Sequence, residues 1–189
     1  MKRMLSAGLL GLSSLSASAL EIQGVRLEEQ VQLADDRKLQ LNGAGLRGFL
    51  FFKMYVAGLY LDSKQTSAAA VMADSGAKRI ALHVVTDNDD TPHFQKGFRK
   101  GIEQNYSAPE LAQLQERLEA FLHLFDSVKA VKKGDVIDLD WQPGAGTRVT
   151  LNGAELGKVA GEDFYRALLS IWIGEKPVSN NVKKGMLGA

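Results

Sequence analysis

The segment Leu41-Asn-Gly-Ala-Gly-Leu-Arg-Gly-Phe-Leu-Phe-Phe-Lys-Met-Tyr-Val-Ala-Gly-Leu-Tyr-Leu-Asp62 carries the strongest structural signal of the chain. Its apolar residues predict two long strands, at residues 39–52 and 53–61, and its glycines mark bulges or places where another group comes close. One permanent cation, Arg47, lies in the first strand. An unpaired guanidinium in an apolar interior is strongly unfavourable. Arg47 must therefore reach solvent, pair with an internal acid, or bind an anion from outside the chain.

Apolar periodicity and turn residues around this segment predict an α+β fold, with helices packed against a mainly antiparallel sheet. Asn152-Gly153 is a strong hairpin signal, and Ser107 and Ser179 are expected helix caps. Further strands are expected at residues 21–33, 79–86, 135–141, 147–151 and 155–159, and helices at 66–74, 89–105, 107–125, 162–172 and after 179.

The first 19 residues have the pattern of a secretory signal peptide. Lys2 and Arg3 precede a short apolar run, and Ala17-Ser18-Ala19 fits the small-residue cleavage site. We expect cleavage after Ala19, a periplasmic location, and one domain over residues 20–189. The apolar run is too short to span a bilayer, so no integral membrane segment is expected after cleavage. A buried N-terminal helix is the alternative.

Composition excludes several classes of site. The chain has no cysteine, which removes thiolate nucleophiles and zinc–sulfur or iron–sulfur centres. The histidines, His83, His93 and His123, show no metal-ligand spacing, so no metal and no cofactor is expected. The formal net charge of +1 is close to neutral, and it stays so without Lys2 and Arg3. This balance argues against nucleic acid or an anionic membrane as the main partner.

Two spaced motifs resemble the chalcone isomerase family. Gly43-Ala-Gly-Leu-Arg-Gly48, followed by Tyr55-Val-Ala-Gly-Leu-Tyr-Leu-Asp62, is similar to the paired strands that open that family. Trp172-Ile-Gly-Glu-Lys-Pro-Val-Ser179 resembles a later family segment. The resemblance covers roughly residues 35–189 and implies an open-faced β-sandwich. It also implies a role for Arg47: catalytic members use the matching arginine for the anionic oxygen of the substrate, and fatty-acid-binding members use it for a carboxylate.

Other family positions differ in ways that argue against catalysis. Catalytic members have a threonine where this chain has Tyr55, and a tyrosine where it has Phe98. The family asparagine is retained as Asn105, and Tyr106 could replace the lost tyrosine. A small hydroxyl residue of catalytic members is replaced here by the large apolar Ile171 and Trp172. Losing hydroxyl groups that polarise a substrate removes most of the means for turnover, so no residue is assigned as catalytic.

The signal peptide and the resemblance together predict a periplasmic chalcone isomerase-like protein that binds an amphipathic anion such as a fatty acid without turnover. Arg47 would be the anchor, Tyr55 or Tyr106 a second donor, and Asn105 a retained polar group. The apolar wall is expected from Phe49, Phe51, Phe98, Ile171 and Trp172. Two alternatives stay open: an isomerase acting on a chalcone or another enone, and a cell-envelope structural or interaction protein in which Arg47 forms an internal ion pair. The oligomeric state is not predicted.

Overall fold

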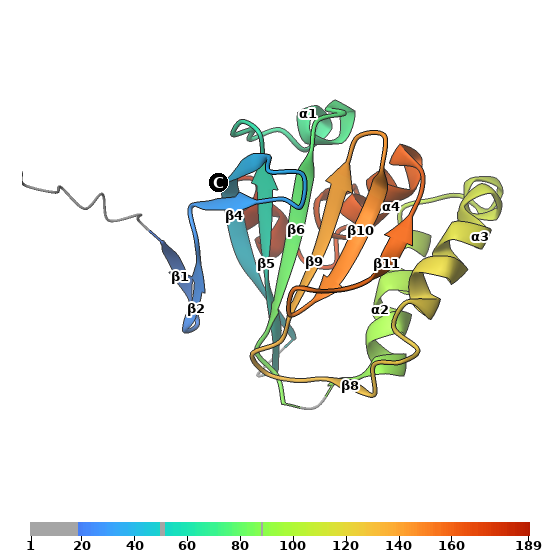
Figure 1. The fold of residues 1–189 in the computed structure, drawn as a ribbon, viewed down its shortest axis with the longest axis horizontal. Coiled ribbons are helices and arrows are strands. Elements are labelled where there is room, and N and C mark those ends of the chain that lie inside the picture. The colour runs from blue at the N-terminus through green and yellow to red at the C-terminus, as the bar shows by residue number, and fades with distance from the viewer. Residues whose placement is uncertain (1–18, 50–51, 88) are drawn as a thin grey trace, which may run out of the picture.

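The computed structural model describes residues 19–49, 52–87 and 89–189 (Figure 1). The expected signal peptide falls on residues 1–18 and so lies outside the described residues, together with most of its cleavage motif. The expected wall residue Phe51 and the side chain of Phe49 are outside them too.

A seven-stranded, fully antiparallel sheet forms the centre of the molecule, in the order β11-β10-β9-β6-β5-β4-β3. Its strands are β3 (Gln30–Gln32), β4 (Lys38–Phe49), β5 (Phe52–Leu61), β6 (Lys78–Val84), β9 (Val136–Gln142), β10 (Gly146–Leu151) and β11 (Ala154–Val159). Asn152 and Gly153 both have positive φ, which the two-residue hairpin between β10 and β11 requires. The predicted antiparallel sheet is confirmed.

The described residues also form five helices, and the larger ones pack against one face of the sheet (Figure 1). They are α1 (Ala68–Ala73), α2 (Thr91–Glu103), α3 (Ala108–His123), α4 (Glu162–Ile173) and α5 (Asn180–Met186). Strand side chains alternate: Leu59, Ile80 and Leu139 enter the main core beneath the helices, whereas Tyr60 belongs to a second core on the outer face. The α+β fold class is thereby confirmed. Within the part of the chain that the structure describes, no helix is long and apolar enough to cross a bilayer.

The N-terminal strand predicted over residues 21–33 is wrong as a single element. The chain forms a separate hairpin of β1 (Leu20–Ile22) and β2 (Val25–Leu27) before β3 joins the sheet. Gln23 and Gly24, with φ of 55° and 76°, make the turn. Leu27 is fully buried against the outer face, where a Cβ at Gly58 would lie 2.7 Å from its Cδ2. The partial alternation of the sequence continued through this turn and concealed it.

A second, smaller correction concerns the segment before α2. Asp89–Asp90 forms strand β7, which pairs with β8 (Ala130–Val131). The sequence predicted a helix from residue 89 and did not predict this pair of short strands.

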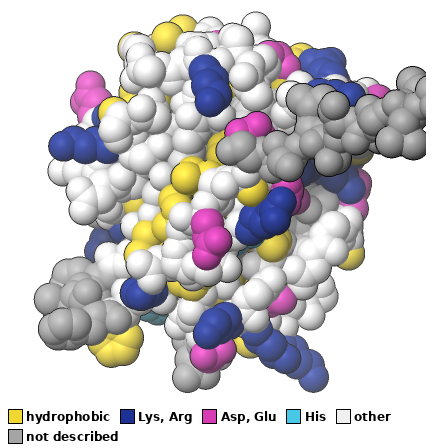
Figure 2. Space-filling view, turned by 90° about the vertical axis from the view of Figure 1, so that its left-hand side faces the viewer, with side chains coloured by type: hydrophobic (Ala, Val, Ile, Leu, Met, Phe, Trp, Pro, Cys, Tyr) yellow, Lys and Arg dark blue, Asp and Glu magenta, His cyan; other side chains and the backbone are white. Residues whose placement is uncertain are grey.

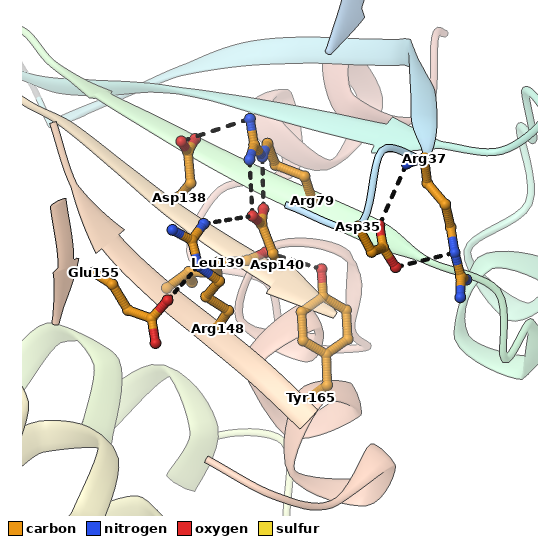
Figure 3. A network of polar contacts seen from close by, with 9 residues as sticks. All are labelled: Asp35, Arg37, Arg79, Asp138, Leu139, Asp140, Arg148, Glu155 and Tyr165. Carbon is orange, nitrogen blue, oxygen red and sulfur yellow. Dashed lines mark hydrogen bonds and ion pairs between the residues drawn. The ribbon is translucent and has the colours of Figure 1, made fainter. Parts of the chain in front are cut away.

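The outer face of the sheet carries a network of ion pairs (Figure 3). The fully buried carboxylate of Asp140 accepts two hydrogen bonds from Arg79, at 2.6 and 2.8 Å, and lies 3.7 Å from Arg148. Arg79 also lies 3.6 Å from Asp138, and Arg148 donates to Glu155 at 2.6 Å. Each carboxylate in the network lies beside a guanidinium, and this attraction offsets part of the cost of removing the charges from water. On the adjoining face in Figure 2, acidic, basic and hydrophobic side chains are interspersed, in keeping with the near-neutral composition.

Candidate functional site

Arg47 faces the helices because β4 contains a bulge at Asn42. The register pairs Leu41 with Tyr60 and then Gly43 with Leu59, so Asn42 has no counterpart on β5. One extra residue moves every following side chain to the other face of the sheet. A strict two-residue period without a bulge would place Arg47 on the same face as Leu39 and Leu41. Instead, both leucines enter the outer core, and Arg47 lies opposite Tyr55.

The glycines of β4 allow a helix to approach closely. A Cβ at Gly43 would lie 2.1 Å from the carbonyl oxygen of Gly185, and one at Gly45 would lie 2.7 Å from the Cα of Val182. The backbone of α5 thus lies directly on this part of the strand. Asn42 holds the same helix, because its Nδ2 donates to the carbonyl of Met186 at 2.7 Å. The close approach predicted from these glycines is made by α5.

The guanidinium of Arg47 differs from that of every other described arginine. Arg47 is half-buried, and its Nη1 donates to the backbone carbonyl of Val178. Seven arginines form ion pairs with carboxylates, namely Arg26, Arg37, Arg79, Arg99, Arg117, Arg148 and Arg166. No such pair involves Arg47 among the residues described. The internal ion pair considered for it therefore has no partner in this part of the chain.

A cavity of about 280 Å³ lies beside Arg47, between β4, β5, α2 and α4. This volume is close to the lower end of the range for small-molecule sites, roughly 300–1,000 Å³. The lining residues are Arg47, Met54, Tyr55, Leu82, His93, Phe94, Lys96, Gly97, Phe98, Lys100, Ile171, Trp172 and Val178.

The exposed side of the cavity, called here the mouth, is polar and cationic, whereas its buried side, called here the inner wall, is largely apolar. Its inner wall is made of buried, largely apolar side chains: Tyr55, Leu82, Phe94, Phe98, Ile171 and Trp172. Its mouth is made of the exposed α2 residues His93, Lys96, Gly97 and Lys100, and the half-buried Arg47 completes the cationic side. None of the described lining residues is acidic. Such a cavity suits a molecule with an apolar body and an anionic head.

Large aromatic rings fix the inner wall. The indole Nε1 of Trp172 donates to the hydroxyl oxygen of Tyr55 at 2.9 Å, and Trp172 is 1% exposed. The Phe98 ring makes edge contacts with Trp172, Phe94 and Phe121, at centroid distances of 6.1, 4.9 and 5.0 Å. The Tyr55 oxygen is thus already an acceptor within the wall, and its action as a donor toward a ligand stays a prediction.

Asn105 and Tyr106, also proposed from the sequence, are not among the residues that line this cavity. The Nδ2 of Asn105 donates to the carbonyls of Gly101 and Lys176, both at 3.0 Å, and its Oδ1 accepts from the Lys176 amide at 2.9 Å. The two bonds to Lys176 tie the end of α2 to the chain after α4. Tyr106 is half-buried at the connection between α2 and α3, where burial raises the pKa of its hydroxyl.

Seven of the proposed site residues have described side chains, and the structure brings five of these together: Arg47, Tyr55, Phe98, Ile171 and Trp172. The sequence interpretation missed the mouth. His93, Lys96, Gly97 and Lys100 follow the i, i+3, i+4, i+7 spacing of one helix face, and this pattern could have placed them together. Among the described residues, no group of three or more His, Asp or Glu is arranged to hold a metal ion.

Comparisons with known proteins agree with this architecture. A family model described as chalcone isomerase-like matches residues 19–188. Fatty-acid-binding protein 1 of Arabidopsis thaliana is 31% identical over 72 residues, which are 38% of this chain and 26% of that protein. The match therefore spans about a quarter of the relative. The crystal structure of the Arabidopsis thaliana fatty-acid binding protein AtFAP1 has a TM-score of 0.62 at 20% identity, covering 84% of this chain and 96% of that one. At this identity the likeness shows the fold alone.

Proposed function

Because the chain belongs to the chalcone isomerase-like family, we propose that it binds an amphipathic anion, such as a fatty acid, and does not convert it. Arg47 binds the carboxylate of the ligand, and the apolar inner wall of the cavity encloses the first part of the ligand's acyl chain. The name of the similar Arabidopsis thaliana protein, fatty-acid-binding protein 1, supports this ligand class.

One observation carries the proposal: Arg47 forms no ion pair with any described residue and stands beside an apolar cavity. A guanidinium binds a carboxylate through two parallel hydrogen bonds, which are stronger than those between neutral groups. Arg79 is satisfied in this way by Asp140 within the fold. Arg47 has the same chemistry available and borders an open space, so its carboxylate partner is supplied by a ligand.

The volume of the cavity limits how many methylene groups of a ligand's acyl chain can be enclosed. Each buried methylene contributes about 0.8 kcal/mol, or roughly a fourfold gain in affinity. A volume of about 280 Å³ is small, so affinity rises along a series of acids only until the cavity is full. A longer tail then continues into solvent or along the surface.

Isothermal titration with straight-chain acids from hexanoate to hexadecanoate tests the proposal. We expect roughly fourfold tighter binding per methylene up to a plateau. We also expect dodecanol to bind about tenfold or more weakly than dodecanoate, because it lacks the charge that Arg47 recognises. Equal affinity for the alcohol and the acid, or no binding of any acid, would contradict the proposal.

The isomerase alternative finds little support in the wall of the cavity. Phe98 offers no hydroxyl, and Trp172 and Ile171 fill space with apolar atoms. We expect a chalcone incubated with the protein to lose ultraviolet absorbance no faster than in buffer. A rate that exceeds the buffer rate and falls in the Arg47→Ala variant would restore the isomerase alternative.

The proposal includes export to the periplasm, with a mature chain that starts at Leu20. The basic start, the short apolar run and the small-residue motif support it. The first described strand, β1, begins at Leu20, directly after the expected cleavage site.

A further inference from the structure

Gly97 lines the cavity, and the packing around it does not explain why this residue is a glycine. Gly97 lies in the middle of α2 and is exposed. A Cβ built at this position would have no heavy atom within 4 Å. Glycine inside a helix lowers stability relative to alanine because it loses more backbone freedom on folding. Position 97 thus keeps an unfavourable residue where a larger one would meet no neighbour.

Gly101, one turn further along α2, is by contrast a glycine that the packing of the helix explains. A Cβ there would lie 2.8 Å from Cγ2 of Ile171, so Gly101 is required for α2 to lie against α4. Gly97 is four residues earlier and hence on the same side of the helix. At Gly97 the corresponding space is part of the cavity, and it is open.

The neighbours of Gly97 give this opening a charge. Lys96 and Lys100 are exposed, line the cavity and flank Gly97 on the same helix face, with His93 one turn before. Among the described lining residues there is no carboxylate to oppose them. The opening therefore lies at Gly97, which has no side chain to fill it. Cationic side chains border the opening, and the apolar inner wall lies behind it.

We propose that Gly97 forms the entrance of the cavity and that the size of residue 97 controls which amphipathic anions enter. The apolar tail passes over the bare backbone of residue 97 to reach Phe98 and Trp172. The anionic head remains at the level of Arg47, within the field of Lys96 and Lys100. This inference rests on the proposed function for the class of ligand, but the residue it assigns is different from the anchor.

Two variants of graded size, Gly97→Ala and Gly97→Leu, test the role of this position. Ala112→Leu is the matched control, because Ala112 is exposed on α3 and is not among the lining residues. Gly97→Ala should raise the melting temperature by roughly 2–4 °C, since a helical glycine is replaced by a residue whose Cβ meets no atom, and Gly97→Leu should melt no lower than the wild type. Stability thus separates loss of binding from loss of fold.

Binding is measured by isothermal titration with dodecanoate and by stopped-flow fluorescence with 1-anilinonaphthalene-8-sulfonate, an amphipathic anionic probe. Gly97→Leu should weaken dodecanoate binding by about tenfold or more, as expected when a side chain fills required space. It should also slow association of the probe. Gly97→Ala should have a smaller effect on both, and Ala112→Leu none.

Three results would overturn the inference. Gly97→Leu could bind dodecanoate as the wild type does, Gly97→Ala could lose as much affinity as Gly97→Leu, or both variants could melt at a lower temperature. Unchanged binding by Gly97→Leu would mean that residue 97 does not form an entrance. Equal losses in the two variants would mean that helix stiffness, and not side-chain size, affects binding. Lower melting temperatures would mean that Gly97 is required for packing. If binding depends on Arg47 and not on residue 97, this inference alone fails. If the wild type binds neither dodecanoate nor the probe, the proposed function fails with it.

Discussion

Arg47 and Arg79 show how one residue type serves two purposes in one sheet. Arg79 lies on β6 directly opposite Asp140 of β9, and the pair is closed within the fold. Arg47 lies opposite Tyr55, which offers no negative charge, and donates only to a backbone carbonyl in the interactions described. The difference depends on which strands become neighbours, a long-range property. The sequence could therefore single out Arg47 as unusual but could not decide between an internal acid and an external anion.

Tyr60 gives a prediction at alkaline pH. Burial, with a further contribution from Asp138, raises its pKa from 10.0 to about 12. Between these values the unfolded chain loses this proton and the folded protein keeps it, so stability falls as pH rises from about 10 to 12. Tyr60→Phe should reduce that loss by up to about 2 kcal/mol. Urea unfolding of both proteins, below pH 10 and near pH 12, measures it; parallel losses in the two proteins would refute the assignment.

Asn105 is predicted to stabilise the fold and not to contact the ligand. Asn105→Ala removes two hydrogen bonds to the backbone of Lys176 and one to the carbonyl of Gly101 within α2, and should lower the free energy of unfolding by about 1–3 kcal/mol. Dodecanoate affinity should stay within about threefold of the wild type, because Asn105 is not among the cavity-lining residues. A large loss of affinity in a protein of unchanged stability would instead return Asn105 to the binding site.

At the level of elements, local signals predicted most strands and helices. The Asn152-Gly153 turn, the Ser179 cap and the apolar stripe of α3 all act between residues close in sequence, and the structure contains each of them. The Asn42 bulge could not be located in this way, because its side chain is satisfied by Gln65 and Met186. These partners come from other elements. The bulge determines which face Arg47 occupies, so the orientation of the site could not be read from the strand period.

The contact between β4 and α5 leads to a further prediction. Gly43→Ala places a Cβ 2.1 Å from the carbonyl oxygen of Gly185. Since that oxygen belongs to the backbone, α5 must move, and we expect a loss of about 1–3 kcal/mol or more in the free energy of unfolding. Gly97→Ala, which meets no atom, serves as the control. Chemical denaturation measures both, and equal stability of Gly43→Ala and wild type would contradict the close packing of α5.

At the level of the whole molecule, the site joins residues that are far apart in sequence, from Arg47 on β4 to Val178 after α4. The sequence motifs pointed to Arg47, the proposed anchor, and to part of the cavity wall, because those positions resemble a family. The mouth on α2 carries no such signal. Lys96 and Lys100 look like ordinary solvated residues until the fold places α2 across from β4.

Export is a prediction about the complete chain. Expressed in a Gram-negative host, the protein should be recovered from the periplasmic fraction with Leu20 as its first residue, because Ala17 and Ala19 fit the signal peptidase site. Intact mass spectrometry gives the N-terminus. Replacing Ala19 by a bulky residue, Ala19→Phe, should leave the precursor uncleaved. A cytoplasmic protein that retains Lys2 and Arg3 would refute export.

The central claim is that Arg47 binds an anion from outside the chain, and isothermal titration of dodecanoate into Arg47→Ala tests it most directly. Arg26→Ala is the control, because it removes the same charge from an exposed position on β2. Loss of a charge-assisted contact is worth about 1.5–3 kcal/mol. Arg47→Ala should therefore bind dodecanoate roughly 10- to 100-fold more weakly, with most of its preference over dodecanol lost. If Arg47→Ala, Arg26→Ala and the wild type bind dodecanoate equally well, Arg47 is not the anchor and the account is wrong.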